Sequence, residues 1–477
     1  MGHARAIRGF VLVIALILGG RCAAEDAPAT PKLSACALPD ISETAGCGMI
    51  EVPEDPDRPA GRKLSIHVAV LPATSGHALL DPIAVLMGGP GEDAIGSAAY
   101  YAGQFAALRA DRDLLFVDQR GTGQSAPLHC DLFSPGDAAA SLRDVFPPAA
   151  VAACEARLAQ AADLTRYAYP YFARDLEQIR RALGYGKLNL FAGSYGTRAA
   201  QVYLRAYPDS VRTAYLGSVV PIDIASPLPF ARTAQAALDR LFADCELDTA
   251  CRSTYPALRE EVSQLLDRLD AGQILVAVPG QAERVPLRRG RVAEWIRAKL
   301  YRPKSSADLP WLLHRAFSGD GQPIADDMLA DAQEADGALS FGLLFAITCS
   351  EDVPFIEESQ VAPQTAGTFL GDYRLRQQQA ACAFWPGVTL PEGYRQPVAS
   401  PVPTLFVTGD LDGGTPLWFT ERVAGGFTEQ ATIVAHGQGH TEWSDCLAAR
   451  YAQFLRSGTV RGLETNCPAV ARPPFKT

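Results

Sequence analysis

Short apolar runs alternate with helical patterns along most of this chain, and this alternation constrains the fold more than any other feature. Seven runs have the length and composition of buried strands: residues 63–71, 82–87, 113–117, 187–192, 213–220, 404–408 and 431–435. Between two of them, residues 173–183 place Leu176, Ile179 and Leu183 on one helical stripe, with charged residues opposite. Because strands alternating with amphipathic helices build a mostly parallel sheet covered by helices, the sequence predicts an α/β fold.

The region between residues 222 and 400 interrupts this alternation. It contains helix-like stretches at 233–245, 255–270 and 324–344, without clear buried strands. Strand-like runs resume at Pro403. We therefore expect residues 25–221 and 401–477 to form one core, with residues 222–400 inserted into it as a largely helical segment.

The first 24 residues differ from the rest of the chain. Arg5 and Arg8 precede an apolar run at residues 9–20, and the small residues Cys22 and Ala24 follow it. The run is short for a spanning helix, and the pattern is typical of a secretory signal peptide cleaved after Ala24. A retained membrane anchor is the alternative. We expect export to a periplasm or to the medium, without stable membrane association after signal removal.

The cysteine content also indicates export. Beyond Cys22, ten cysteines remain: Cys36, Cys47, Cys130, Cys154, Cys245, Cys251, Cys349, Cys382, Cys446 and Cys467. An even number in an exported chain predicts disulfides, and we expect five pairs formed between sequential cysteines, although other connectivities are open. The sequence has no paired CxxC motif, which argues against a zinc site.

The overall charge excludes one class of partner. Lys and Arg number 43 against 53 Asp and Glu, which gives a net charge of -10. Such a chain has no general basic field to hold a polyanion, so we expect no nucleic-acid partner. Anionic lipid surfaces are disfavoured for the same reason.

The strongest local signal for chemistry is the segment AGSYGT around Ser194. It follows an apolar run and continues into a helical stretch, as a serine nucleophile on a tight strand-to-helix turn does. Gly193 and Gly196 supply the small neighbours that such a turn needs, while Ala192 replaces the first glycine of the usual GxSxG pattern. The alternative is a small-residue strand end that packs a helix.

A serine nucleophile needs a base and an orienting acid, and both types follow downstream. The run 404–408 leads into GDLDGGTP, which offers Asp410 and Asp412, and the run 431–435 leads into HGQGH, which offers His436 and His440. Serine, acid and histidine in this order are typical of α/β-hydrolases. We favour Asp412, which lies further out in its loop, and His440, which lies between Gly439 and a predicted helix start.

Acyl transfer also needs backbone donors for the developing oxyanion. One is expected from the N–H of Tyr195, directly after the nucleophile, and the other from Gly88 or Gly89 in the turn MGGPG. A second glycine-bearing turn, DQRGTGQS, lacks the spacing of a phosphate-binding or dinucleotide-binding loop. We expect Asp118 and Arg120 in this turn to form a structural ion pair.

Six motifs together carry a resemblance to a known family: MGGPG, DQRGTGQS, ARDLEQIRRALG, AGSYGT, GDLDGGTP and GQGH. From about residue 47 to residue 467, the chain resembles the exported prolyl iminopeptidase and tripeptidyl aminopeptidase group of α/β-hydrolases. The resemblance implies Ser194 as nucleophile, Asp412 as orienting acid and His440 as general base. It also implies a helical lid at residues 222–400 and a tripeptidyl-type C-terminal part. Met87, where the group usually has histidine, and Ala192 depart from the pattern.

An exopeptidase of this kind must hold the free ammonium of its substrate. The segment AITCSED resembles the cysteine and acidic residue of the family's lid, which indicates Glu351 as anchor, with Asp352 second; a solvated acidic turn is the alternative. By the same resemblance, Cys349 is expected to pair with Cys382.

The predicted protein is thus a secreted serine aminopeptidase that acts on peptides with a free N-terminus. The expected chemistry requires neither cofactor nor metal. The competing hypotheses are a carboxylesterase or other acyl hydrolase using the same triad, and a non-catalytic binding module that has kept the fold.

Overall fold

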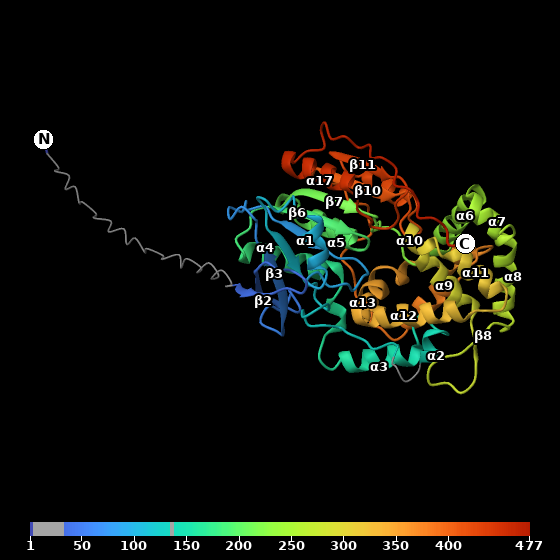
Figure 1. Cartoon of the computed structure of the whole chain (residues 1–477). Helices are drawn as coiled ribbons and strands as arrows, with labels where there is room; N and C mark the ends of the chain where they lie inside the picture. Colours follow the sequence, from blue (N-terminus) through green and yellow to red (C-terminus); the bar gives the residue numbers. More distant parts are fainter. Residues whose placement is uncertain (3–32, 134–137) are drawn as a thin grey trace.

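A nine-stranded mixed sheet forms the centre of the computed structural model, which describes residues 1–2, 33–133 and 138–477 (Figure 1). Its spatial order is β1-β2-β3-β5-β4-β6-β7-β10-β11. The pairs from β1 to β5 are antiparallel, and all pairs from β5 to β11 are parallel. The strands are β1 (Ser34–Cys36), β2 (Ala45–Pro53), β3 (Lys63–Leu71), β4 (Ile83–Leu86), β5 (Leu114–Val117), β6 (Leu188–Gly193), β7 (Val211–Gly217), β10 (Thr404–Gly409) and β11 (Gln430–Ala435).

Alternate side chains of the central strands enter two different cores, one on each face of the sheet. In β4, Ala84 and Leu86 pack into one core, while Ile83 and Val85 pack into the other. The first core also contains residues of α3 (Pro148–Leu158), α4 (Tyr169–Ala182) and α5 (Gly196–Ala206). The second contains residues of α1 (Ala98–Gln104) and α17 (Asp445–Ser457). Because both faces are covered, the central strands β4 and β5 are apolar throughout, as is typical of buried parallel strands.

The predicted α/β fold, a mostly parallel sheet flanked by helices, is confirmed. Each of the seven apolar runs corresponds to a strand of the sheet, with bounds that differ by a few residues at most. The sequence did not indicate β1 and β2, which extend the sheet at its antiparallel edge.

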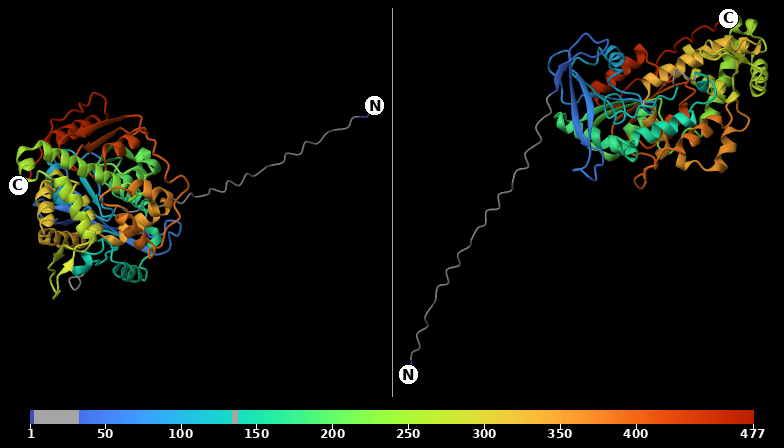
Figure 2. Two further views of the ribbon diagram at one scale, coloured as in Figure 1. Left: turned by 90° about the vertical axis from the view of Figure 1, so that its right-hand side faces the viewer. Right: turned by 90° about the horizontal axis from the view of Figure 1, so that it is seen from below.

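Helices dominate the chain between β7 and β10, and they form a second lobe beside the sheet (Figures 1 and 2). They are α6 (Phe230–Leu247), α7 (Thr249–Thr254), α8 (Leu258–Asp270), α9 (Arg289–Lys299), α10 (Pro303–Ser306), α11 (Leu309–Phe317), α12 (Gln322–Ala338), α13 (Phe341–Glu351), α14 (Glu358–Thr365) and α15 (Tyr373–Cys382). A two-stranded ladder, β8 (Leu275–Val276) with β9 (Val285–Pro286), joins them. The remaining α-helices of the described residues are α2 (Ala138–Ser141) and α16 (Leu417–Ala424).

The helical lobe has its own hydrophobic core. Buried residues of α6, α8, α9, α11 and α12 form one cluster, which also includes Phe475 from the C-terminal segment. That segment runs from α17 across to the helical lobe, where the Tyr255 hydroxyl donates to the Lys476 carbonyl at 3.0 Å.

All five expected disulfides are present: Cys36–Cys47, Cys130–Cys154, Cys245–Cys251, Cys349–Cys382 and Cys446–Cys467. Five structural disulfides are typical of exported proteins. The predicted signal peptide at residues 1–24 falls almost entirely outside the described residues. Within the part of the chain that the structure describes, none of the helices combines the length and the hydropathy needed to cross a bilayer.

The two charged residues of the DQRGTGQS turn do not pair with each other, contrary to expectation. Arg120 instead forms a bidentate ion pair with Asp175 on α4, with both N–O distances at 2.7 Å. Asp118 accepts hydrogen bonds from the backbone N–H groups of Ala94 and Ile95 at 3.0 and 2.9 Å. Each side chain thus fastens a different neighbouring segment to the turn.

Candidate active site

Ser194 lies on a sharp turn between β6 and α5. Its φ of 53° is in the left-handed region, which non-glycine residues rarely adopt, and its N–H donates to the Gly217 carbonyl at 3.0 Å. A Cβ at Gly196 would lie 2.3 Å from the carbonyl oxygen of Leu86, so only glycine fits where the helix begins. Ala192 is tolerated because it is a regular, fully buried residue of β6, before the turn begins. The turn thereby exposes the serine side chain at the end of the sheet.

Asp412 and His440 form a hydrogen-bonded pair at the carboxyl ends of β10 and β11. The Nδ1 atom of His440 lies 2.9 Å from Oδ2 of Asp412. The other carboxylate oxygen accepts the backbone N–H groups of Gly414 and Thr415 at 2.8 and 2.9 Å. Burial alone raises the pKa of Asp412, but His440 and the Thr415 hydrogen bonds outweigh it, so the pKa lies below its ordinary value. The carboxylate is therefore ionised at neutral pH and suited to orient the ring.

Thr415 supports this pair from the side. Its hydroxyl lies 2.6 Å from Oδ2 of Asp412 and 3.1 Å from Nδ1 of His440. The hydroxyl donates to the carboxylate, which fixes the oxygen that faces the imidazole. No local pattern in the sequence indicated a role for Thr415.

The loop of His440 is held from the helical lobe. The His440 N–H donates to the carbonyl of Tyr301, just after α9, at 2.7 Å, and the two rings lie 4.9 Å apart. Arg302 Nε donates to the His440 carbonyl at 3.4 Å. No local sequence signal indicated these contacts, which join residues about 140 positions apart.

The alternative acid and base candidates pair with each other elsewhere. His436 Nδ1 lies 3.1 Å from Oδ2 of Asp410, and the Gly437 N–H donates to the same carboxylate at 2.7 Å. The His436 side chain is exposed. Asp410 therefore stabilises the surface turn that precedes the His440 loop.

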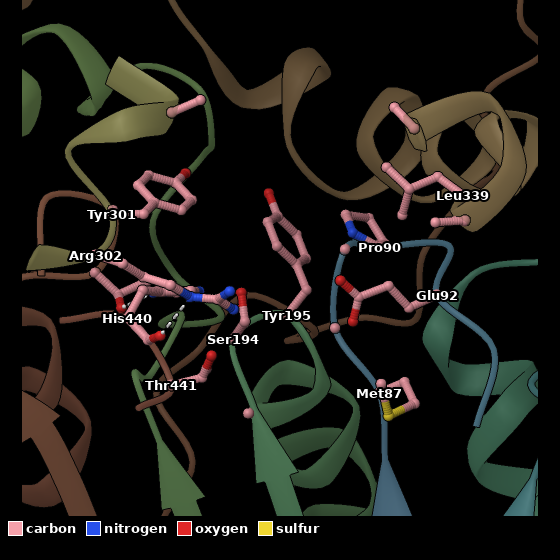
Figure 3. A pocket seen from close by; sticks show the side chains of 18 of the residues that line it. Met87, Pro90, Glu92, Ser194, Tyr195, Tyr301, Arg302, Leu339, His440 and Thr441 are labelled. Carbon is pink, nitrogen blue, oxygen red and sulfur yellow. Dashed lines mark hydrogen bonds between the residues drawn. The ribbon is translucent and has the colours of Figure 1, made fainter. Parts of the chain in front are cut away.

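A large cavity of about 1460 Å³ connects the remaining candidates (Figure 3). Ser194, His440, Gly88, Gly89 and Tyr195 all line it. A Cβ placed on Gly88 would lie 3.0 Å from Cβ of Ser194, so the MGGPG turn runs directly beside this serine, and Gly89 has a φ of 100°. The structure records no hydrogen bond between the described Ser194 and His440 side chains, a bond that often tightens only when substrate is bound.

Glu351 and Asp352 do not reach this cavity, contrary to expectation. Both side chains are completely buried, and neither lines the cavity. Glu351 accepts hydrogen bonds from the Tyr169 N–H at 2.8 Å and from the Tyr394 hydroxyl at 2.5 Å. Burial raises the pKa of Glu351 to about 7, although Arg198 and these donors oppose the rise.

Asp352 pairs instead with Arg198 on α5, with an N–O distance of 2.8 Å, and accepts from the Tyr195 hydroxyl at 3.2 Å. It therefore helps to fix Tyr195, the residue that follows Ser194. Glu351 and Asp352 lie in the interior, and not in the cavity, because they end helix α13, whose eleven residues are all buried. A helix that is apolar on every side carries its terminal acids into the interior.

Other charged residues do line the cavity, among them Glu92, Glu294, Arg297, Arg302, Glu334 and Arg374. Within the described residues, no group of three or more His, Cys, Asp or Glu side chains is arranged to hold a metal ion.

Two family models match this chain. A model of the alpha/beta hydrolase fold covers residues 81–277, and a model described as TAP-like protein covers residues 367–467. The chain belongs to the α/β-hydrolases. The family resemblance expected from the six motifs is thereby confirmed.

This α/β-hydrolase is similar in sequence to several named proteases and peptidases. Serine protease Hip1 of Mycobacterium tuberculosis is 29% identical over 428 residues, which cover 81% of this chain and 80% of Hip1. Tripeptidyl aminopeptidase of Streptomyces lividans is 30% identical over 195 residues, which cover 36% of this chain and 35% of that enzyme. A solved proline iminopeptidase from Mycobacterium smegmatis is 18% identical, covers 86% of this chain and 98% of its own, and has a TM-score of 0.41. The matches to the α/β-hydrolase model, to Hip1 and to tripeptidyl aminopeptidase place this chain in a serine hydrolase and protease-like family.

Proposed function

We propose that this α/β-hydrolase is an exported serine exopeptidase, an aminopeptidase that hydrolyses peptide bonds near free N-termini through an acyl-enzyme. The observation that carries the proposal is the buried 2.9 Å contact between Asp412 and His440, at the cavity that Ser194 also lines. Five disulfides support export, and the peptidase names of the relatives support peptide substrates.

In the first step, His440 accepts the proton of the Ser194 hydroxyl as its Oγ attacks the carbonyl carbon of the scissile peptide bond. Asp412, bound to Nδ1, keeps the other ring nitrogen free as acceptor and stabilises the imidazolium. The N–H of Tyr195 and one from Gly88 or Gly89 donate to the developing oxyanion. The imidazolium then protonates the leaving amine, the C–N bond breaks, and an ester to Ser194 remains.

In the second step, His440 takes a proton from water, whose oxygen attacks the acyl carbon. The imidazolium returns that proton to Oγ of Ser194 as the ester bond breaks, and the released acid is the N-terminal fragment. Every proton and bond is accounted for by the three side chains and water, so we propose that neither cofactor nor metal takes part.

The cavity is large enough for a peptide. Its volume of about 1460 Å³ exceeds the roughly 300–1,000 Å³ typical of small-molecule sites. Residues of both the sheet core and the helical lobe line it, which supports residues 222–400 as the lid of the site. We propose no nucleic-acid partner and no stable membrane association.

The test compares p-nitroanilides of single amino acids and of tripeptides with their N-acetylated forms, and with simple p-nitrophenyl esters. We expect turnover of the free amides and much slower turnover of the acetylated ones. Efficient ester hydrolysis without amide hydrolysis would instead identify a carboxylesterase. The Ser194→Ala variant serves as the inactive control for every substrate.

A further inference from the structure

Glu92 is a carboxyl group beside the nucleophile for which the triad mechanism has no use. It follows the MGGPG turn and lines the cavity, on the opposite side of Ser194 from His440 (Figure 3). Its Oε2 atom lies 3.5 Å from the point where a Cβ on Gly88 would be, and Cβ of Ser194 lies 3.0 Å from the same point. Oε2 of Glu92 and Cβ of Ser194 therefore lie no further apart than the sum of these two distances.

The Glu92 carboxyl lacks a charged partner. Among the described residues, none forms an ion pair with it, and its side chain makes no hydrogen bond to another side chain within the same set. Burial raises the pKa of Glu92, while the charges of His440 and Arg302 and a hydrogen bond from the Gly88 amide act in the opposite direction. Glu92 is half-buried at the wall of the cavity, and its carboxyl is not neutralised by an ion pair in the described part of the chain, so it can bind a cation that enters the cavity with the substrate.

The position of this carboxyl is also fixed. Asp118 holds the N–H groups of Ala94 and Ile95, two and three residues further on, and the backbone of Glu92 pairs with that of Leu339 at the end of α12. The carboxyl thus faces the cavity from a loop that is anchored both to the core and to the helical lobe.

A negative charge here is unfavourable for a neutral substrate, because the reaction develops a second negative charge on the nearby oxyanion. A substrate that brings its own positive charge removes this disadvantage. Because peptides with a free N-terminus carry an ammonium group, the local electrostatics favour them over uncharged acyl groups.

We propose that Glu92 binds the α-ammonium of the same residue whose carbonyl carbon Ser194 attacks, so that single N-terminal residues are released. This proposal rests on the proposed exopeptidase function. In such a residue the ammonium nitrogen and the carbonyl carbon are separated only by Cα. In a tripeptidyl substrate, two further residues of extended chain, roughly 7 Å, would separate the ammonium from the reacting carbonyl. A carboxyl adjacent to the serine matches the first arrangement.

The other carboxyl groups that line the cavity are less suited to this role. Asp331 forms an ion pair with Lys299 at 3.2 Å. Glu294 is buried against Arg297 and Arg374, with N–O distances of 2.6 and 3.2 Å. Glu442 accepts the Gly439 N–H at 2.7 Å, in the loop of the proposed base. Glu334, on α12, is exposed and lines the cavity from the helical lobe.

The test uses three forms of the full chain: wild type, Glu92→Gln and Glu334→Gln as a matched control. The substrates are the p-nitroanilides of alanine, leucine and proline, and p-nitrophenyl propionate, whose acyl group is that of alanine without the ammonium. We expect Glu92→Gln to lower kcat/KM for the aminoacyl amides by about 10- to 100-fold, the effect of losing a hydrogen bond between charged groups. Turnover of the propionate should be unchanged or higher, which also shows that this variant is folded. Glu334→Gln should resemble wild type on all substrates.

Four results would overturn the inference. An equal loss on amides and propionate would mean that Glu92 supports the fold or the imidazolium. A selective loss in Glu334→Gln would move the anchor to the helical lobe. Release of intact tripeptides by the wild type, without single residues, would leave the exopeptidase function standing but remove this anchor. If the wild type hydrolysed the propionate and no amide of any kind, the proposed function itself would fail, and this inference with it.

Discussion

The hydroxyl of Thr415 offers the sharpest test of the site, because one methyl-for-hydroxyl exchange removes it. In Thr415→Val, Oδ2 of Asp412 loses the donor at 2.6 Å, while the backbone donors to Oδ1, at 2.8 and 2.9 Å, remain. The imidazole contact at 2.9 Å is left to hold that oxygen alone. Asp412 stays buried, so water does not replace the missing donor.

The size of the effect follows from the charge on the acceptor. A hydrogen bond to an ionised group contributes about 1.5–3 kcal/mol net, and about 1.36 kcal/mol corresponds to a tenfold change in rate. Because three other donors still contact Asp412, we expect kcat/KM to fall by about 10- to 100-fold. Loss of the serine nucleophile has a much larger effect, which separates a positioning residue from a catalytic one.

The assay is steady-state hydrolysis of a p-nitrophenyl ester and an aminoacyl p-nitroanilide by wild type, Thr415→Val and Thr415→Ser. The serine variant keeps the hydroxyl and should retain most of the activity, and both variants should melt within a few degrees of wild type. If valine and serine at this position gave equal rates, the argument that the hydroxyl orients the carboxylate would be refuted.

Three further predictions concern the nucleophile and two buried charges. Ser194→Ala should lower kcat for the ester by about four orders of magnitude or more, and an active variant would rule out the serine mechanism. The pKa of Glu351 is about 7 in the folded protein and 4.5 ordinarily, so between these pH values the folded chain keeps a proton that the unfolded chain has lost. The free energy of unfolding should therefore fall by roughly 3 kcal/mol as the pH rises through this range. Urea unfolding at pH 5 and pH 8 should show a smaller fall for Glu351→Gln, and an unchanged fall would contradict this assignment. Arg120→Met should cost about 3–5 kcal/mol in urea unfolding, because it leaves Asp175 buried without its ion pair, and the double variant with Asp175→Leu should recover part of that loss.

The parts of the fold that the sequence predicted are those with local signals. Central parallel strands are apolar on both faces, so their runs are visible without knowledge of the partners. Strand β2, next to the edge strand β1, buries Ile50 and Val52 but also contains Gly46, Gly48 and a terminal proline, which weaken the pattern. Strand β1 has only three residues and depends on pairing with β2.

The same distinction applies to the site. The serine turn and the acid and histidine loops carry glycines and polar residues at strand ends, so they were found by spacing. The positions of Glu351 and Asp352 depend on how α13 packs, and Tyr301 reaches His440 only through tertiary structure. The long apolar stretch before Glu351 indicates burial of this acid, whereas the family resemblance indicates a position in the cavity; the structure agrees with the apolar stretch.

The hydrogen bond from His440 to the Tyr301 carbonyl has a consequence for enzyme engineering and for divergence within the group. The segment that shapes the cavity also supports the loop of the proposed base. A chimera that exchanges residues 222–400 with those of a relative would thus alter the reaction step along with the choice of peptide. Selectivity and speed are expected to vary together among such hybrids, unless the backbone at position 301 is preserved.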